Sequence, residues 1–238
     1  MKNRILALLM LCMLLCASAA FAEGETIPLA QAGVGDSIVF GAYEQDDDES
    51  NGKEPIEWLV LERKIDRVLV ISRYVLDDQP YHTLDQDATW ETCFLRMWLN
   101  GHFMNEAFTS DEQARILTTT VQAEADTAAY PGTKAGNNTE DQVFLLSYSQ
   151  AVRYFPEKQD SLCEPTAYAE AQGAAVPANN PALRRYSQSK GTTWWLRSTG
   201  SMQDMASHVL ASGGPEKGGN SISVGIGVRP VMWLAINP

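Results

Sequence analysis

Apolar and polar positions alternate in two stretches near the start of the chain. Residues 37–43 ("SIVFGAY") and 56–72 ("IEWLVLERKIDRVLVIS") show a period of two, and the turn "RKID" divides the second stretch. Successive side chains of a strand point to opposite faces of a sheet, so this pattern predicts a strand followed by a hairpin. We expect three antiparallel strands to open the fold.

The middle of the chain has the spacing of helices. Residues 89–108 carry apolar side chains at a period of 3.6, which predicts an amphipathic helix that Asn100 and Gly101 end or bend. Three shorter helices are predicted from their start and stop signals: capping boxes at Ser110/Gln113 and Ser147/Gln150, and the segment 165–173, which begins with Pro-Thr and ends with Gly.

Short apolar segments return in the last quarter of the chain. We predict strands at "TTWWLRS", "ASHVLAS", "SISVG" and "VRPVMWLAI", and no regular structure between Gly173 and Gly191. Strands grouped at both ends of the chain, with helices in the middle, indicate an α+β fold rather than an alternating α/β fold.

The first residues predict export. Lys2 and Arg4 precede the apolar run 5–17, and Ala20-Phe21-Ala22 fits a cleavage site, which is typical of a signal peptide. We therefore divide the chain into a signal peptide (1–22), a lead-in (23–34) and one domain (35–238). The expected location is secreted or cell-surface, with no integral membrane segment after cleavage; a retained or lipid-linked anchor is the alternative.

Charge and cysteine content narrow the classes of partner. The net charge is −12, and the leader holds two of the basic residues and no acid. Nucleic-acid binding needs clustered Lys and Arg, so we do not expect a nucleic-acid partner. Cys93 and Cys163 remain after cleavage, and either a disulfide between them or two buried thiols is compatible with an exported protein.

Several blocks resemble a known family. "GKEPIEWLVLE", "TWETCFLRMWLNGHF", "NTEDQVFLLS", "CEPTAYAEAQGA", "WWLRSTG" and "GVRPVMWL" are similar, in order, to the consensus of a bacterial family catalogued as domain of unknown function number six-two-seven-three. The final strands also resemble those of C-type-lectin-like domains and formylglycine-generating enzymes. That wider resemblance implies a C-type-lectin-like fold, a small antiparallel sheet with helices and a long irregular region that presents ligands.

The chemistry of those relatives does not carry over. The calcium motifs of sugar-binding lectins have no match beyond "EPT" at 164–166 and "QPY" at 79–81, and no cysteine follows Cys163. A calcium loop counted from Asp47 would need Glu at its twelfth position, where Trp58 stands. His102 and Glu106 have helical i, i+4 spacing, but a third metal ligand is not evident. We expect no metal, no cofactor and no catalytic group.

The candidate binding residues lie near the end of the chain. Alternation in "TTWWLRS" predicts that one of Trp194 and Trp195 faces outward, where an aromatic ring can stack on a sugar. Arg197 and Arg229 are expected to pair with buried carboxylates. The polar, glycine-rich segment 201–220 is predicted to form binding loops. The predicted ligand-binding residues are Trp194, Trp195, Arg197, Ser201, Gln203, Asp204, His208 and Asn220.

Two classes of function follow from this interpretation. The first is an exported, non-enzymatic binding module for a glycan or an extracellular protein. The alternative is a secreted enzyme acting on polysaccharide or cell-wall material, or a structural envelope component. Acids and histidines that converge in one pocket would favour the enzyme, and scattered ones the binding module.

Overall fold

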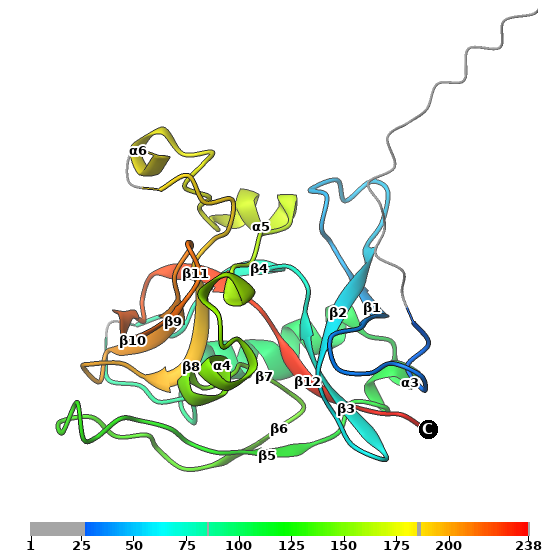
Figure 1. The fold of residues 1–238 in the computed structure, drawn as a ribbon, viewed down its shortest axis with the longest axis horizontal. Coiled ribbons are helices and arrows are strands. Elements are labelled where there is room, and N and C mark those ends of the chain that lie inside the picture. The colour runs from blue at the N-terminus through cyan, green and yellow to red at the C-terminus, as the bar shows by residue number, and fades with distance from the viewer. Residues whose placement is uncertain (1–26, 85, 185–186, 238) are drawn as a thin grey trace, which may run out of the picture.

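The computed structural model describes residues 27–84, 86–184 and 187–237 (Figure 1). The predicted signal peptide lies outside these residues. Within them, no helix has the length and apolar character needed to cross a membrane.

The first sheet contains the predicted opening strands. β1 (Ser37–Tyr43), β2 (Glu54–Arg63) and β3 (Arg67–Ser72) pair in sequence order, which confirms the strand and hairpin predicted from the alternation. The sheet is completed from far along the chain, by β12 (Val231–Ala235) against β3 and by β7 (Val143–Phe144) against β12. The end of the chain is therefore part of the same sheet as its beginning.

A second five-stranded sheet is formed mostly by the last quarter of the chain. Its order is β10 (Pro215–Ser221), β9 (Met205–Val209), β8 (Trp194–Thr199), β11 (Gly225–Val228) and β4 (Asp77–Pro80). β10 corrects the prediction, because it occupies part of the segment 201–220 that we expected to be loop. Its sequence is polar and contains two glycines, so it shows no alternation of apolar residues, but its backbone pairs with β9. The segment "SISVG", predicted as a strand, is mainly the turn between β10 and β11. A two-stranded ribbon, β5 (Thr119–Val121) and β6 (Thr139–Asp141), was not predicted.

The helices follow the predicted positions with four differences. The long middle helix consists of α1 (Phe94–Trp98), the π-helix η1 (Leu99–Phe103) and α2 (Met104–Ala107), so the expected irregularity at Asn100-Gly101 is a π-turn. The capping box of α3 (Ser110–Gln113) is formed by Thr109 and Glu112, one residue before the predicted pair. α4 (Tyr148–Tyr154) and α5 (Ala167–Gln172) are the other two predicted helices. The 3-10 helix η2 (Lys158–Ser161) was not predicted, and α6 (Pro181–Arg184) corrects the expectation of no regular structure between Gly173 and Gly191.

The predicted caps of α4 and α5 are confirmed. Ser147 and Gln150 form a capping box, Thr166 caps α5, and Gly173 follows it with φ 135°. One hydrophobic cluster includes residues of both sheets and of α1, and β11 leads directly into β12 from one sheet to the other (Figure 1). The fold is α+β. Cys93 and Cys163 are both buried free thiols, so the second of the two cysteine alternatives is the one observed.

Candidate functional site

A pocket of about 380 Å³ lies where the first sheet meets the helices. Its walls come from the end of β1, the loop between β1 and β2, the η1–α2 segment and α5. The lining residues are Tyr43, Glu44, Glu49, Gly52, Lys53, His102, Glu106 and Tyr168. Acids, a histidine and two tyrosines from distant parts of the sequence therefore converge in one place.

A buried hydrogen bond lies under the pocket. The Tyr43 hydroxyl donates to Asp77 Oδ2 at 2.6 Å, and Asp77 Oδ1 accepts from Gln79 Nε2 at 3.1 Å and from the Asp78 backbone N–H at 2.7 Å. Burial raises the pKa of Asp77, while these donors act in the opposite direction. Burial, and then the Asp77 carboxylate, raises the pKa of Tyr43 well above its usual range. The Tyr43 hydroxyl is thus held as a neutral donor.

His102 is carried by the π-helix. Its exposed ring lies against the ring of Trp98, with centroids 5.9 Å apart. Single π-turns inside α-helices occur frequently at functional sites, since the extra residue re-aims the side chains of one turn. Here His102 lies close enough to Asp77 and Glu106 that a charge on its ring acts to lower the pKa of both carboxyl groups.

Two glutamates of the pocket have opposite environments. Lys53 Nζ donates to Glu106 Oε2 at 2.7 Å and to the Glu106 carbonyl at 2.6 Å, and this contact lowers the pKa of Glu106. Glu44 is 8% exposed, and its pKa is raised by burial first and then by the charges of Glu54 and Asp46. The pKa values of these two carboxyl groups are thus shifted in opposite directions.

Tyr168 forms the aromatic wall. The backbone N–H of Tyr168, in α5, donates to the Gln45 carbonyl at 3.0 Å, which joins the helix to the end of β1. Its half-buried ring meets the ring of Tyr43 edge to face, with centroids 5.8 Å apart. Part of this ring therefore remains available to a ligand.

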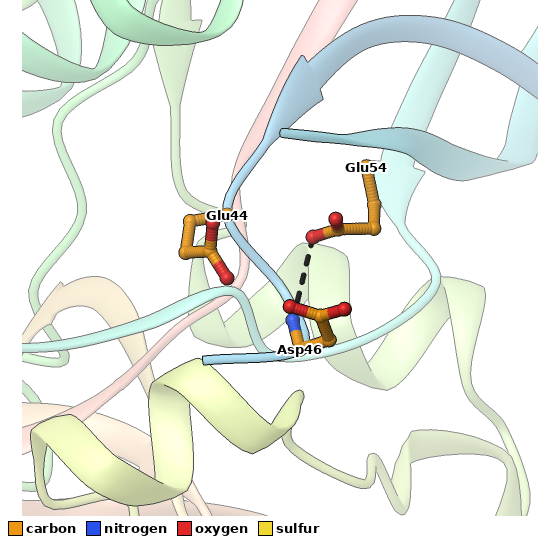
Figure 2. A group of neighbouring side chains, drawn as sticks. All are labelled: Glu44, Asp46 and Glu54. Atoms are coloured by element: carbon orange, nitrogen blue, oxygen red, sulfur yellow. Dashed lines mark hydrogen bonds between the residues drawn. The ribbon is translucent and has the colours of Figure 1, made fainter. Parts of the chain in front are cut away.

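Three carboxylates at the base of the β1–β2 loop are the acidic group, among the residues that the structure describes, whose spacing could suit a cation. Glu44, Asp46 and Glu54 have carboxylate oxygens within 4.8 Å of one another (Figure 2). Backbone N–H groups already use several of them: Glu54 accepts from Gln45 and Asp46 at 2.7 and 3.3 Å, and Glu44 accepts from Asp48 at 3.0 Å. The loop is ordered by its own carboxylates, and the cluster does not coincide with the calcium loop counted from Asp47.

The predicted outward tryptophan does not exist. Trp194 and Trp195 are both fully buried, and their indole N–H groups donate to the carbonyls of Ser161 and Gln79. All six residues of β8 are buried, because both faces of this central strand are covered. The alternating side chains of β8 therefore point into the core on both sides of the strand, and neither indole offers a face for stacking.

The prediction for the two arginines is wrong about their partners. Within the described residues, neither Arg197 nor Arg229 has a carboxylate within 4 Å. Arg197 donates to the carbonyls of Leu145 and Gln122 and to Gln150 Oε1, and burial lowers its pKa to about 10. Arg229 lies over the rings of Trp194 and Phe155 and donates to the Ser72 carbonyl. Both lock the terminal strands through carbonyls and aromatic rings.

The other predicted residues are spread over separate places. Gln203, Arg197 and Asn220 line three different cavities, of about 420, 360 and 440 Å³. Gln203 holds the Lys134 backbone N–H at 2.7 Å and the Ala88 carbonyl at 3.0 Å, which is a structural role. Ser201 and Asp204 are half-buried, and His208 is buried. None of these three cavities gathers the eight residues.

One pattern in the sequence did point to residues of this pocket. The His102/Glu106 spacing was noted as a metal-ligand pattern, and both side chains line this pocket. Tyr43, Glu44 and Tyr168 were missed because each stands at the end or start of an element, where periodicity carries no information about which residues meet in space.

A family model described as a domain of unknown function (DUF6273) matches residues 65–236. No curated protein and no solved structure matches the chain. His102, Glu106 and Tyr168 lie inside the matched segment, while Tyr43, Glu44 and Lys53 precede it, so both parts of the chain are needed to form the pocket.

Proposed function

The chain belongs to the DUF6273 family, and we propose that it is a binding module that takes a glycan into the pocket between Tyr43, His102 and Tyr168. The observation that carries this proposal is the half-exposed Tyr168 ring beside several carboxylates. A sugar presents a C–H face that packs on an aromatic ring and hydroxyls that donate to carboxylates. Lys53 and His102 add donors at the rim.

The location and the finer fold belong to the same proposal. The charged and apolar leader supports an exported protein, secreted or at the cell surface, in which a glycan is an available ligand. The α+β architecture, with strands from both ends of the chain and helices between them, is compatible with a C-type-lectin-like domain. Its ligand would be held at the junction of β1 and the helices rather than by the C-terminal loops.

A second candidate function rests on the convergence of acids and a histidine in this pocket. Glycoside hydrolysis needs one carboxyl that is protonated and one that is ionised. Glu44, with its raised pKa, would be the acid, and Glu106, with its lowered pKa, the base or nucleophile. This enzyme would use the same pocket and the same class of ligand.

The test is a glycan-array screen of the purified protein, run in calcium and again in chelator. For the glycan bound most tightly, titration calorimetry then compares the wild type with Tyr168→Ala. We expect about a fivefold loss of affinity, which corresponds to the roughly 1 kcal/mol of an aromatic contact. Tyr74→Ala, which removes an exposed tyrosine outside the pocket, is the matched control and should bind like the wild type.

Hydrolysis is measured on the same glycan. Turnover that is lost in Glu44→Gln and Glu106→Gln, with affinity retained, would identify the enzyme. No binding to any glycan, or equal affinity in Tyr168→Ala, would overturn the glycan proposal.

A further inference from the structure

Two adjacent aspartates in β4 serve opposite sides of the strand. Asp77 is the acceptor of Tyr43 beneath the glycan pocket, and Asp78 lines a different cavity of about 440 Å³. Neighbouring side chains of a strand point to opposite faces, so this separation follows from the backbone. The second cavity, here called the Asp78 pocket, has walls that include Gly173, Thr193, Asn220, Val224 and Ile226.

Glycines make room for the Asp78 carboxylate. A Cβ atom at Gly173 would lie 3.1 Å from Asp78 Oδ1, and a Cβ atom at Gly225 would collide with the same oxygen. Gly173 also follows the end of α5 with a φ of 135°, a backbone conformation that residues with a side chain rarely adopt. Two glycines from distant segments therefore leave the space into which this carboxylate fits.

The carboxylate is not neutralised by the residues around it. Within the described residues, no side chain or backbone N–H donates to Asp78 Oδ1 or Oδ2, and no Lys, Arg or His lies within 4 Å. Burial, and then the Asp77 charge, raises the pKa of Asp78 to about 6, so the group is still ionised at pH 7.5. Partly buried carboxylates are normally paired with a donor or a cation.

We propose that the Asp78 pocket binds a small organic ammonium ion with an apolar body. The ammonium group would donate to the free oxygens of Asp78, and the apolar body would pack on Pro177, Leu183, Val224 and Ile226. A divalent metal ion fits less well, because it needs several oxygen ligands and this cavity supplies one carboxylate. An anion fits less well, because the Asp78 carboxylate lines the cavity. This site is separate from the proposed glycan pocket.

The test is titration calorimetry with benzylammonium chloride at pH 7.5, with benzyl alcohol as the neutral probe of the same shape. We expect benzylammonium to bind and benzyl alcohol to bind at least tenfold more weakly. Asp78→Asn, which keeps the shape and removes the charge, should weaken benzylammonium at least tenfold. Asp111→Asn, which removes an exposed carboxylate of α3 far from this pocket, is the control for general attraction to an acidic protein.

The pH dependence gives an independent readout. Affinity of the wild type for benzylammonium should fall when the pH is lowered from 7.5 to 5, while Asp78→Asn should show no such fall. Equal binding by wild type and Asp78→Asn, equal binding of the charged and neutral probes, or no binding of benzylammonium would each overturn the proposal. The glycan screen does not depend on these results.

Discussion

At the scale of single residues, Asp77 and Asp78 acquire different chemistry although they are adjacent. Asp77 accepts three hydrogen bonds, from Tyr43, Gln79 and the Asp78 backbone, whereas Asp78 accepts none from the described residues. Burial disfavours the charged form of both carboxylates, but hydrogen bonds offset part of this effect at Asp77. The unpaired carboxylate is the one expected to cost folding stability.

The stability of the protein should record this cost. The pKa of Asp78 is about 6 in the folded chain and about 4 when unfolded, so the folded state holds the proton more tightly. Its ionisation therefore destabilises the fold as pH rises from about 4 to about 6. Asp78→Asn should be more stable than the wild type by about 1–3 kcal/mol at pH 7.5 and nearly equal to it at pH 4. Urea unfolding at four pH values measures this difference.

The control for this prediction is again Asp111→Asn, whose stability should differ from the wild type by a small amount at every pH. A difference between Asp78→Asn and the wild type that stays constant from pH 4 to pH 7.5 would contradict it. The charge would then not be the cause.

The burial of Trp194 and Trp195 is a property that sequence patterns do not predict. Alternation in β8 correctly predicted a strand, but it could not show that both faces of that strand are covered. Burial of Trp194 and Trp195 depends on segments far away in the sequence, such as the ends of β4 and η2 that accept their N–H groups. Tyr168 was missed for the same reason, since its partners Tyr43 and Gln45 are on another element.

At the scale of elements, the π-helix carries His102 into the proposed glycan pocket, and a local sequence feature determines where it forms. Asn100 holds it in place with four hydrogen bonds: its Nδ2 donates to the carbonyls of Arg96 and Val143, and its Oδ1 accepts from the N–H groups of Gln142 and Val143. The side chain thus substitutes for a strand partner of β7. The Asn-Gly pair predicted an interruption of the helix. The hydrogen bonds of the Asn100 side chain explain why the interruption is a π-helix.

Asn100→Ala should affect stability and the site together. Loss of four hydrogen bonds, with backbone groups of β7 left unpaired, is expected to lower the free energy of unfolding by about 2–4 kcal/mol. The segment carrying His102 and Glu106 should also shift, so glycan affinity should fall in the folded variant. Urea unfolding and calorimetry measure the two effects.

Asn105→Ala, in the exposed part of α2, is the matched control and should change neither quantity by much. If Asn100→Ala lowers stability while glycan affinity is unchanged, the π-helix would be structural and would not position the pocket.

Short elements mark the limit of prediction at this scale. The hairpin β2–β3 and the caps of α4 and α5 were predicted because each carries a local signal, alternation or a Ser/Thr cap. β4 carries none: its sequence is Asp-Asp-Gln-Pro, and it is a strand because β11 pairs with it. The β5–β6 ribbon depends on pairing between segments about twenty residues apart. Such strands are properties of the assembled fold.

At the scale of the whole molecule, the two five-stranded sheets depend on one another. The chain passes from β11 in the second sheet to β12 in the first within three residues, and one hydrophobic cluster includes Ile71 of β3 and Leu196 of β8. A sheet that lost its shared core would expose a large apolar surface. We therefore expect the two sheets to unfold together, as the single-domain division predicts.

Matched truncations test this cooperativity. Ile71→Ala and Leu196→Ala each remove a fully buried side chain and should each lower the free energy of unfolding by about 2–5 kcal/mol. Hydrogen exchange followed by mass spectrometry in increasing urea should give one midpoint for peptides of both sheets in each variant. Ile65→Ala, the same change at a side chain that is 98% exposed, should leave that midpoint almost unchanged. A midpoint that moves for the first sheet alone in Ile71→Ala would mean that the sheets are separate folding units, and the glycan pocket would then belong to the first of them.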